Sequence, residues 1–252
     1  FSSGSEGPPK GVMLTHRNIM GNIKQISSVL NPQNDVIMDS LPLFHAFGLT
    51  VTSLLPMTEG MPCVCQPDPT NAAAIGKLVA AHRVTLLCAT STFLRLYTRD
   101  RKLVPLMFKS LRLVVAGAER LAPDVRAGFK TKFGLDVHEG YGTTETTPVA
   151  SVNIPDVLVP DYWFLQQGSR EGTVGLPLPG STFKIVDPLT LEELPTGEAG
   201  LILISGTQIM KGYLDDPERT ADQLVALLQD GHATRHFTVF QNALYFSVSI
   251  RK

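Results

Sequence analysis

Apolar residues in the first part of the chain alternate between a spacing typical of helices and short runs typical of buried strands. The stretch 16–30 repeats an isoleucine or leucine every three or four residues and is followed by Asn31-Pro32, which predicts a helix that ends there. Helical patterns also cover 71–83, which begins on the capping residue Asn71, and 122–134, which closes on a glycine. Short apolar runs that indicate strands occupy 35–43, 84–89, 111–118 and 135–142.

This alternation predicts an α/β fold, with layered helices and a largely parallel sheet. From about Gly172 the pattern changes to short strands separated by proline and glycine turns, which predicts a small β subdomain. We therefore expect a partial α/β subdomain over 1–171, a β-rich subdomain over 172–222, and a C-terminal segment over 223–252 that matches neither pattern.

Composition and charge narrow the class of protein. With 252 residues and 43% hydrophobic content, the chain is long enough to bury a core. The net charge is −1 and no run of Lys or Arg exceeds two residues, so we expect no nucleic-acid partner. The apolar stretches are shorter than the roughly 20 residues that span a bilayer, and the first residues lack the layout of a signal peptide. We expect a chain without a transmembrane segment, taken from a longer protein.

The chain has three cysteines, an odd number, and they lie among apolar residues. We interpret Cys63, Cys65 and Cys88 as buried, reduced residues of a cytoplasmic protein, because a disulfide framework would need paired cysteines. Cys63 and Cys65 also lack the C-x-x-C spacing of metal or redox sites, so we assign them to a strand.

The first stretch with candidate chemistry is Ser2–Gly11, "SSGSEGPPKG". Its glycines allow backbone amides to converge on phosphate oxygens, its serines supply hydroxyl donors, and Lys10 brings a positive charge. The stretch fails the template G-x-x-x-x-G-K-S/T of the P-loop nucleotide hydrolases, because two prolines separate Gly7 from Lys10. Taken alone, such a loop is either a phosphate cradle or an ordinary surface turn.

A second stretch, "EGYGTTETTP" at 139–148, lies at the carboxyl end of a predicted strand. In open α/β sheets, ligands collect at such strand ends. Tyr141 could stack on a base, Thr144 could donate to a phosphate, and Glu145 could hold Mg²⁺ beside phosphate oxygens. An ordinary loop with a solvated glutamate is the alternative for this stretch alone.

Together the two stretches resemble the adenylate-forming superfamily, which includes acyl-CoA synthetases, luciferases and peptide-synthetase adenylation domains. The phosphate loop of that family, S/T-S-G-S/T-T-G-x-P-K-G, matches 2–11 at every defined position except Glu6, and its aromatic-G-x-T-E motif matches 141–145. "LPLFHAFGL" at 41–49 resembles its acyl-site segment, and 197–220 resembles its G-E-x-G to G-Y-x-x-x-P-x-x-T segment. The resemblance covers 1 to about 222 and implies part of the family's large N-terminal domain.

A closer resemblance is to the synthetase domain of the bacterial 2-acylglycerophosphoethanolamine acyltransferase/acyl-(acyl-carrier-protein) synthetases. It rests on Glu6 in the loop and on the stretches 88–97, 112–121 and 132–155. An aryl- or amino-acid-activating enzyme, or a nucleotide-binding module without catalysis, are the alternatives that stay open. The closer group implies a cytoplasmic location, with the cytoplasmic face of the bacterial inner membrane as an option for the parent protein.

The resemblance implies roles for individual residues. Glu145 would bind Mg²⁺, Thr144 would contact the α-phosphate of ATP, and His45 would lie beside the acyl carboxylate. The loop residues that would fold over the β- and γ-phosphates are Ser2, Ser3, Gly4, Ser5, Gly7 and Lys10. The residues that would line the nucleotide on the other side are Gly117, Ala118, Glu119, Gly140, Tyr141, Gly142 and Thr143. Thr144, Glu145, His45 and Lys10 are the implied catalytic set.

The implied reaction is attack of a fatty acid carboxylate on the α-phosphate of ATP, which yields an acyl-adenylate and pyrophosphate. Because a carboxylate is already anionic at neutral pH, this step needs alignment and charge neutralisation but no general base. The implied partners are a fatty acid, ATP with Mg²⁺, and the thiol of acyl-carrier protein or CoA that accepts the acyl group.

The chain departs from the family after "DPERT" at 216–220. The family continues with a D-G-W/F-x-x-T-G-D segment, a hinge and a small domain with a catalytic lysine, and 223–252 matches none of these. We therefore expect this chain by itself to carry much of the ATP and acyl site and to be a poor catalyst.

Overall fold

The computed structural model of the chain describes residues 1–2, 9–32, 34–161, 163–229 and 232–240. Its main sheet has the strand order β10-β7-β6-β5-β4-β2-β3. Five of these strands, from β3 to β6, pair in parallel, and β7 and β10 continue the sheet antiparallel at one edge. Their bounds are β2 Ile37–Asp39, β3 Cys63–Cys65, β4 Leu86–Ala89, β5 Leu113–Ala116, β6 Val137–Gly142, β7 Val149–Val152 and β10 Leu176–Pro177. The predicted α/β fold with a largely parallel sheet is confirmed.

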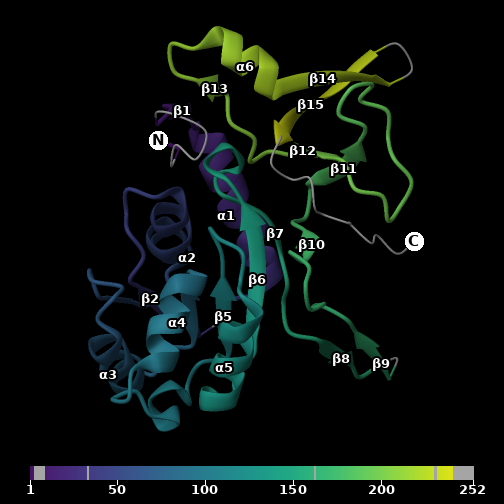
Figure 1. The fold of residues 1–252 in the computed structure, drawn as a ribbon. Helices are drawn as coiled ribbons and strands as arrows, with labels where there is room; N and C mark the ends of the chain where they lie inside the picture. The colour runs from purple at the N-terminus through teal and green to yellow at the C-terminus, as the bar shows by residue number, and fades with distance from the viewer. Residues whose placement is uncertain (3–8, 33, 162, 230–231, 241–252) are drawn as a thin grey trace.

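Helices cover both faces of this sheet (Figure 1). The helices are α1 His16–Leu30, α2 Leu55–Glu59, α3 Ala72–His82, α4 Ser91–Arg99, α5 Pro123–Phe133 and α6 Pro217–Gln223. The side chains of β4 alternate between the faces: Leu87 packs with α3, α4 and α5, whereas Leu86 packs with α1 and α2. A strand buried on both faces carries a continuous apolar run, which is why its pattern was readable in the sequence.

The helix ends follow local chemistry. The hydroxyl of Thr15 accepts a hydrogen bond from the amide of Asn18 at the start of α1, and Asn31 ends that helix in the left-handed conformation. Asn71 caps α3 in the same way through the amide of Ala74, and Gly134 ends α5 with a φ of 71°. The three helices predicted from the sequence are therefore confirmed, with bounds within about two residues.

The remaining strands form smaller sheets. One is antiparallel in the order β11-β12-β15-β14 (Thr182–Val186, Leu201–Ser205, His232–Phe240 and Leu224–Gln229), and α6 leads directly into its strand β14 (Figure 1). The first β-rich strand, β10, pairs with β7 of the main sheet, so the change of sheet falls between β10 and β11. The predicted subdomain boundary at residue 172 stays a prediction.

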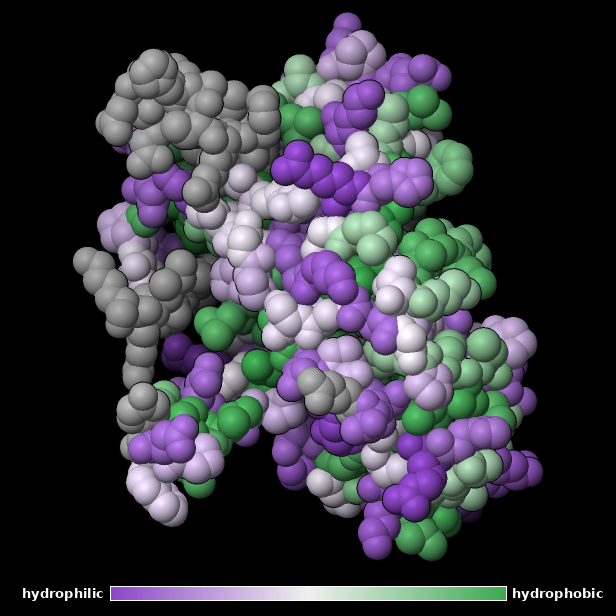
Figure 2. All heavy atoms as spheres, turned by 180° about the vertical axis from the view of Figure 1, so that it is seen from behind, coloured by the Kyte–Doolittle hydropathy of each residue, from purple (hydrophilic) through white to green (hydrophobic). Residues whose placement is uncertain are grey.

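Two short strand pairs complete the fold. β1 (Val12–Met13) pairs antiparallel with β13 (Gly212–Tyr213), which joins the start of the chain to the end of the β-rich part. The hairpin of β8 (Val157–Val159) and β9 (Phe164–Gln166) exposes apolar side chains, seen at the lower left of Figure 2. In the described part, no helix is both long enough and apolar enough to cross a bilayer.

The thiols correct one expectation. Cys88 is buried in β4, but Cys63 and Cys65 are exposed on β3. The prediction that all three are buried is wrong for these two, because β3 is the edge strand and pairs with β2 alone. A run of apolar residues does not distinguish an edge strand from a central one.

Candidate functional site

The carboxyl ends of the five parallel strands meet at one edge of the sheet, and most candidate residues follow them there. The chain leaves β2 for β3 on one side and then returns to β4 on the other side of β2. Loops diverge at such a reversal of strand order, which is where open α/β sheets bind ligands. His45 follows β2, Gly117 follows β5, and Thr144 follows β6.

The segment after β2 lies against the end of β5. A methyl group at Gly117 would lie 3.1 Å from the ring of Phe47, so the glycine and the ring are in direct contact. The structure thereby brings the predicted acyl segment, 41–49, next to the predicted nucleotide segment, 117–119. These two segments are separated by 70 positions or so in the sequence, and only the parallel order of the strands joins them.

His45 has a defined tautomer. Its Nδ1 accepts a hydrogen bond from the amide of Phe47 at 3.2 Å, so Nε2 carries the proton and is a donor. Burial lowers the pKa of His45. The imidazole is therefore neutral at neutral pH and offers one N–H to an anionic ligand.

Ala118 and Glu119 form the turn after β5. Ala118 has a φ of 66°, and the Glu119 carboxylate accepts a hydrogen bond from the amide of Thr92 at 2.5 Å. Burial alone would raise the pKa of Glu119, but hydrogen bonds from Thr92 and Thr90 outweigh it and lower that pKa. Glu119 thus caps the start of α4, a structural use of one of its oxygens.

The end of β6 combines a structural glycine with a packed tyrosine. A methyl group at Gly142 would lie 1.7 Å from the carbonyl oxygen of Pro148, so this position is restricted to glycine by the backbone of its own turn. Tyr141 packs against the core of the small β sheet, and burial, followed by the charge of Glu145, raises its pKa. A methyl group added at Gly140 would lie an ordinary 3.4 Å from the carbonyl oxygen of Ser151. Thr143 leads from β6 into the short turn 144–146.

Glu145 is the most enclosed charged candidate, with 9% of its surface exposed. Its carbonyl oxygen accepts a hydrogen bond from the amide of Met210 at 2.9 Å, and its Oε1 accepts one from Oη of Tyr213 at 2.8 Å. Within the part of the chain that the structure describes, Oε2 accepts no hydrogen bond. A buried carboxylate with one uncommitted oxygen fits the donor chemistry of Mg²⁺, which takes one or two carboxylates together with phosphate oxygens and water.

The described ends of the first loop are Ser2 and Lys10, and Lys10 lies close to Tyr213, the tyrosine that donates to Glu145. Ser2 and Lys10 close the loop: the Ser2 amide donates to the Lys10 carbonyl at 2.9 Å, and the Lys10 amide donates to the Ser2 hydroxyl at 3.1 Å. Nζ of Lys10 lies 5.2 Å from the centre of the Tyr213 ring. Ser3, Gly4, Ser5 and Gly7 lie outside the described residues, as does Glu6.

Tyr213 was missed by the sequence reasoning as a functional residue. It lies within the matched stretch 197–220, so its membership of a motif was visible, but its contacts with Lys10 and Glu145 were not. A cavity of about 510 Å³ also lies beside it, lined in part by Met13, Thr220 and Leu224. None of the residues nominated from the sequence lines that cavity.

Comparisons with known proteins give a family. A family profile described as AMP-binding enzyme matches residues 1–214. The long-chain-fatty-acid–CoA ligase of Salmonella typhimurium is 31% identical over 235 residues, which are 92% of this chain and 39% of the ligase. The 4-coumarate–CoA ligase 1 of Oryza sativa subsp. japonica is 32% identical over 232 residues, with coverage of 90% and 40%. The chain thus spans about two fifths of the length of these relatives.

Solved structures agree with this fold. ATP-bound MatB from Rhodopseudomonas palustris superposes with a TM-score of 0.77 at 28% identity, over 94% of this chain and 43% of MatB. A long-chain-fatty-acid–CoA ligase from Archaeoglobus fulgidus gives a TM-score of 0.75 at 25% identity, over 94% of this chain and 46% of that ligase. The likeness covers both the main sheet and the smaller one.

Proposed function

The chain belongs to the AMP-binding enzyme family, the adenylate-forming superfamily, and from that premise we propose that its parent protein activates a fatty acid as an acyl-adenylate. The relatives named as long-chain-fatty-acid–CoA ligases support a fatty acid as the substrate. One observation carries the proposal. Lys10, the lysine of the first loop, and Glu145 both contact Tyr213 beside the carboxyl edge of the sheet.

In the proposed reaction, one bond to phosphorus forms and one breaks. A carboxylate oxygen of the fatty acid forms a bond to the α-phosphorus of ATP, and the bond from that phosphorus to the bridging oxygen of the β-phosphate breaks, so pyrophosphate leaves. No proton has to be removed, since the carboxylate is ionised at neutral pH. The task of the protein is alignment and compensation of negative charge.

Several of the nominated residues have a place in this task. The neutral imidazole of His45 offers its Nε2–H to the fatty acid carboxylate, which the acyl segment holds near the end of β5. Lys10 supplies positive charge to the phosphates, together with the donors of the loop, and Thr144 supplies a hydroxyl after β6. The nucleotide base and ribose take the side formed by Gly117, Ala118, Gly140 and Tyr141.

Glu145 would hold Mg²⁺ through its uncommitted oxygen. When bound, the ion neutralises charge on the phosphate oxygens of ATP. The protein contributes the enclosure of the carboxylate and its fixed orientation, which come from Met210 at the backbone and Tyr213 at the side chain.

For the second half-reaction we propose the thiol of acyl-carrier protein or of CoA as acceptor. The curated relatives named above are CoA ligases, which supports CoA. The resemblance of the loop with Glu6 and of 132–155 to the acyl-(acyl-carrier-protein) synthetases supports the carrier protein. The parent protein can be incubated with ATP, a fatty acid and each thiol in turn. Detection of the thioester by mass spectrometry then shows which thiol is the acceptor.

Fatty-acid-dependent exchange of labelled pyrophosphate into ATP, measured on the intact parent protein, tests the proposal. We expect exchange with long-chain fatty acids and little with 4-coumarate or amino acids. Exchange that follows an aryl or amino acid would reassign the substrate, and ATP binding without exchange for any acid would make the protein a nucleotide-binding module.

The metal assignment is tested with Glu145→Gln, which keeps the acceptor oxygen for Tyr213 and removes the charge. We expect Mg²⁺-dependent exchange to fall by about 100-fold or more, with the fold retained. Glu192→Gln, an exposed carboxylate in a surface turn, is the matched control and should leave exchange unchanged. Normal exchange in Glu145→Gln would refute the assignment.

A further inference from the structure

Two segments that are far apart in the sequence meet at one buried side chain, Tyr213. It lies in β13 with 4% of its surface exposed. Its ring contacts Lys10 from the start of the chain, its hydroxyl contacts Glu145 after β6, and its amide contacts Thr220 in α6.

The hydroxyl of Tyr213 sets the orientation of Glu145. It donates to Oε1 at 2.8 Å, in a site from which water is largely excluded. A neutral donor to a buried carboxylate holds that group without cancelling its charge. Since Met210 fixes the backbone carbonyl of Glu145 at 2.9 Å, both ends of the residue are held by one segment, 210–213.

The ring of Tyr213 contacts Lys10. Nζ of Lys10 lies 5.2 Å from the ring centre, within the range of a cation–π attraction. The backbone of Lys10 is also fixed, by its two hydrogen bonds with Ser2 and by the pairing of β1 with β13. The lysine is therefore held close to the position of Glu145 without an ion pair between them.

Tyr213 is itself rigidly placed. Its amide donates to Oγ1 of Thr220 at 2.9 Å, and that hydroxyl donates to the carbonyl of Asp216 at 2.8 Å. Gly212 has a φ of 148°, and a methyl group there would lie 2.7 Å from Thr220. The G-Y-x-x-x-P-x-x-T stretch thus holds the backbone of Tyr213 in place.

We propose that Tyr213 is a positioning residue for the metal site: its hydroxyl holds Oε1 of Glu145 so that Oε2 faces the cation, and its ring holds Lys10 on the opposite side. This inference rests on the proposed function, in which Glu145 binds Mg²⁺ with ATP. Tyr213 acts through Glu145 and Lys10 and touches neither substrate nor cation.

The test separates the hydroxyl from the ring. In the intact parent protein, Tyr213→Phe removes the hydroxyl and keeps the ring, and Tyr213→Leu removes both. Mn²⁺ binding to the complex with a non-hydrolysable ATP analogue, followed by electron paramagnetic resonance, reports the metal site without turnover. Removal of an outer-shell partner typically weakens metal binding by 10- to 100-fold, and we expect about tenfold weaker Mn²⁺ binding for Tyr213→Phe.

The two variants should differ in nucleotide affinity. Tyr213→Phe keeps the cation–π contact, so the KM for ATP at saturating Mg²⁺ should stay within about twofold of wild type, whereas Tyr213→Leu should raise it. Lys10→Met should weaken ATP binding in the Tyr213→Phe background as in wild type, and much less in the Tyr213→Leu background.

Tyr97→Phe is the matched control. Tyr97 is also buried, and its hydroxyl donates to the carbonyl of Pro69 at 2.9 Å, away from this site. It should lose comparable thermal stability and keep wild-type Mn²⁺ affinity. Equal Mn²⁺ affinities for wild type and Tyr213→Phe, equal losses of Mn²⁺ affinity in Tyr213→Phe and Tyr97→Phe, or no Mn²⁺ binding by wild type would each overturn the inference.

Failure of the proposed function gives a different result. If wild type exchanges no pyrophosphate with any fatty acid, but its Mn²⁺ binding still depends on the Tyr213 hydroxyl, the fatty acid activation is wrong and the positioning role stands. If exchange is normal in wild type and Mn²⁺ binding is indifferent to Tyr213→Phe, the activation stands and the positioning role is wrong.

Discussion

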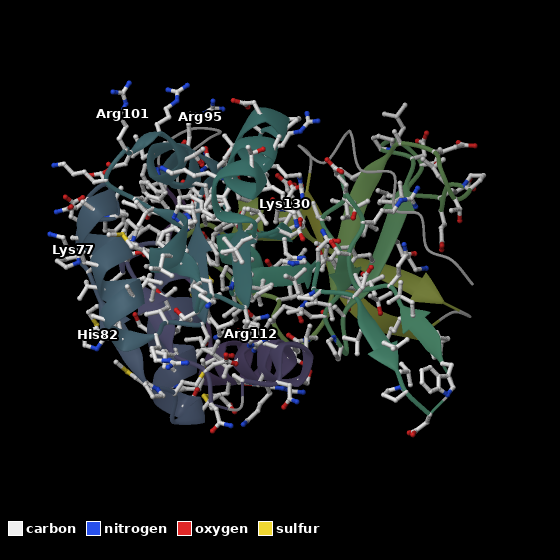
Figure 3. All side chains as sticks on the ribbon, turned by 90° about the horizontal axis from the view of Figure 1, so that it is seen from below. Lys77, His82, Arg95, Arg101, Arg112 and Lys130 are labelled. Carbon is white, nitrogen blue, oxygen red and sulfur yellow. The ribbon has the colours of Figure 1, made fainter. Side chains whose placement is uncertain are left out.

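Asp35 and Arg112, 77 positions apart, form an ion pair at the amino ends of the parallel strands, at the edge opposite the candidate site; the Asp35 carboxylate is buried, whereas the Arg112 side chain, labelled in Figure 3, is 42% exposed. Nε of Arg112 donates to Oδ1 of Asp35 at 2.7 Å, and Oγ1 of Thr85 donates to the same oxygen at 2.6 Å. Asp35 precedes β2, Thr85 precedes β4, and Arg112 precedes β5. One carboxylate therefore aligns the starts of three neighbouring strands.

We predict that Asp35 makes the fold sensitive to acid. Burial alone would raise the pKa of Asp35, but hydrogen bonds from Arg112 and Thr85, with the charge of Arg112, outweigh it and lower that pKa below the ordinary value of 3.8. A lowered folded-state pKa stabilises the fold above the unfolded pKa, and this contribution is lost as the pH falls through the folded pKa. Unfolding by urea should show stability falling below about pH 4 in wild type and falling less in Asp35→Asn.

At neutral pH, Asp35→Asn should cost about 1 to 2 kcal/mol, because the buried side chain loses charge-assisted hydrogen bonds while the half-exposed Arg112 guanidinium can still reach water. Asp136→Asn is the control, because Asp136 pairs with Lys130 on the exposed surface (Figure 3) and should cost less than about 1 kcal/mol. Equal losses in the two variants would refute the role of Asp35.

We predict that Gly142 is required for the fold of the β6 turn. Its added methyl group would lie 1.7 Å from the carbonyl oxygen of Pro148, a backbone atom that cannot move aside, so Gly142→Ala should cost about 3 kcal/mol of stability. Gly140→Ala, two residues earlier in the same strand, meets its neighbour at an ordinary 3.4 Å and should change stability by less than about 1 kcal/mol. Thermal unfolding of both variants measures these losses. A Gly142→Ala variant as stable as wild type would contradict the prediction.

For His45 we predict a role in binding the fatty acid through Nε2–H. His45→Ala should raise the KM for the fatty acid about tenfold, the effect of losing a hydrogen bond to a charged group. His45→Gln can place an N–H near the same point and should recover part of this loss. Because burial lowers the pKa of His45, the ring is already neutral, and the KM should not change between pH 7 and pH 8. A KM that rises tenfold over that range would show that the charged imidazolium is the binding form.

We predict that Cys63 alkylates slowly although it is exposed. Partial burial, with the neighbouring thiol of Cys65 and the carboxylate of Asp39, raises the pKa of Cys63 to about 12. Since the thiolate is the nucleophile, its reaction with iodoacetamide at pH 8 should be slow and should quicken about tenfold per pH unit up to about pH 11. Peptide mass spectrometry measures the rate, and the unfolded chain is the control. Complete labelling of Cys63 within minutes at pH 8 would contradict this prediction.

The sequence by itself determined the local elements and the family. The helical stripe at 16–30, the cap at Asn71 and the buried runs of β4, β5 and β6 depend on neighbours within a few positions, so a linear pattern shows them. The motifs at 2–11 and 141–145 were likewise readable, because the spacing of loop residues is local. Short elements could not be predicted in this way. Helix α6 has seven residues and none of them is buried, so its sequence carries no periodic apolar pattern.

Only the tertiary structure decided which distant residues meet. The exposure of Cys63 depends on the edge position of β3, and the contact of Phe47 with Gly117 depends on the order of the strands. Tyr213 is one of five tyrosines, and the sequence motifs singled out Tyr141 instead. Its role follows from the pairing of β1 with β13, which brings Lys10 and Glu145 to one ring although 135 positions separate them. Such contacts arise from the packing of whole sheets, and no local spacing encodes them.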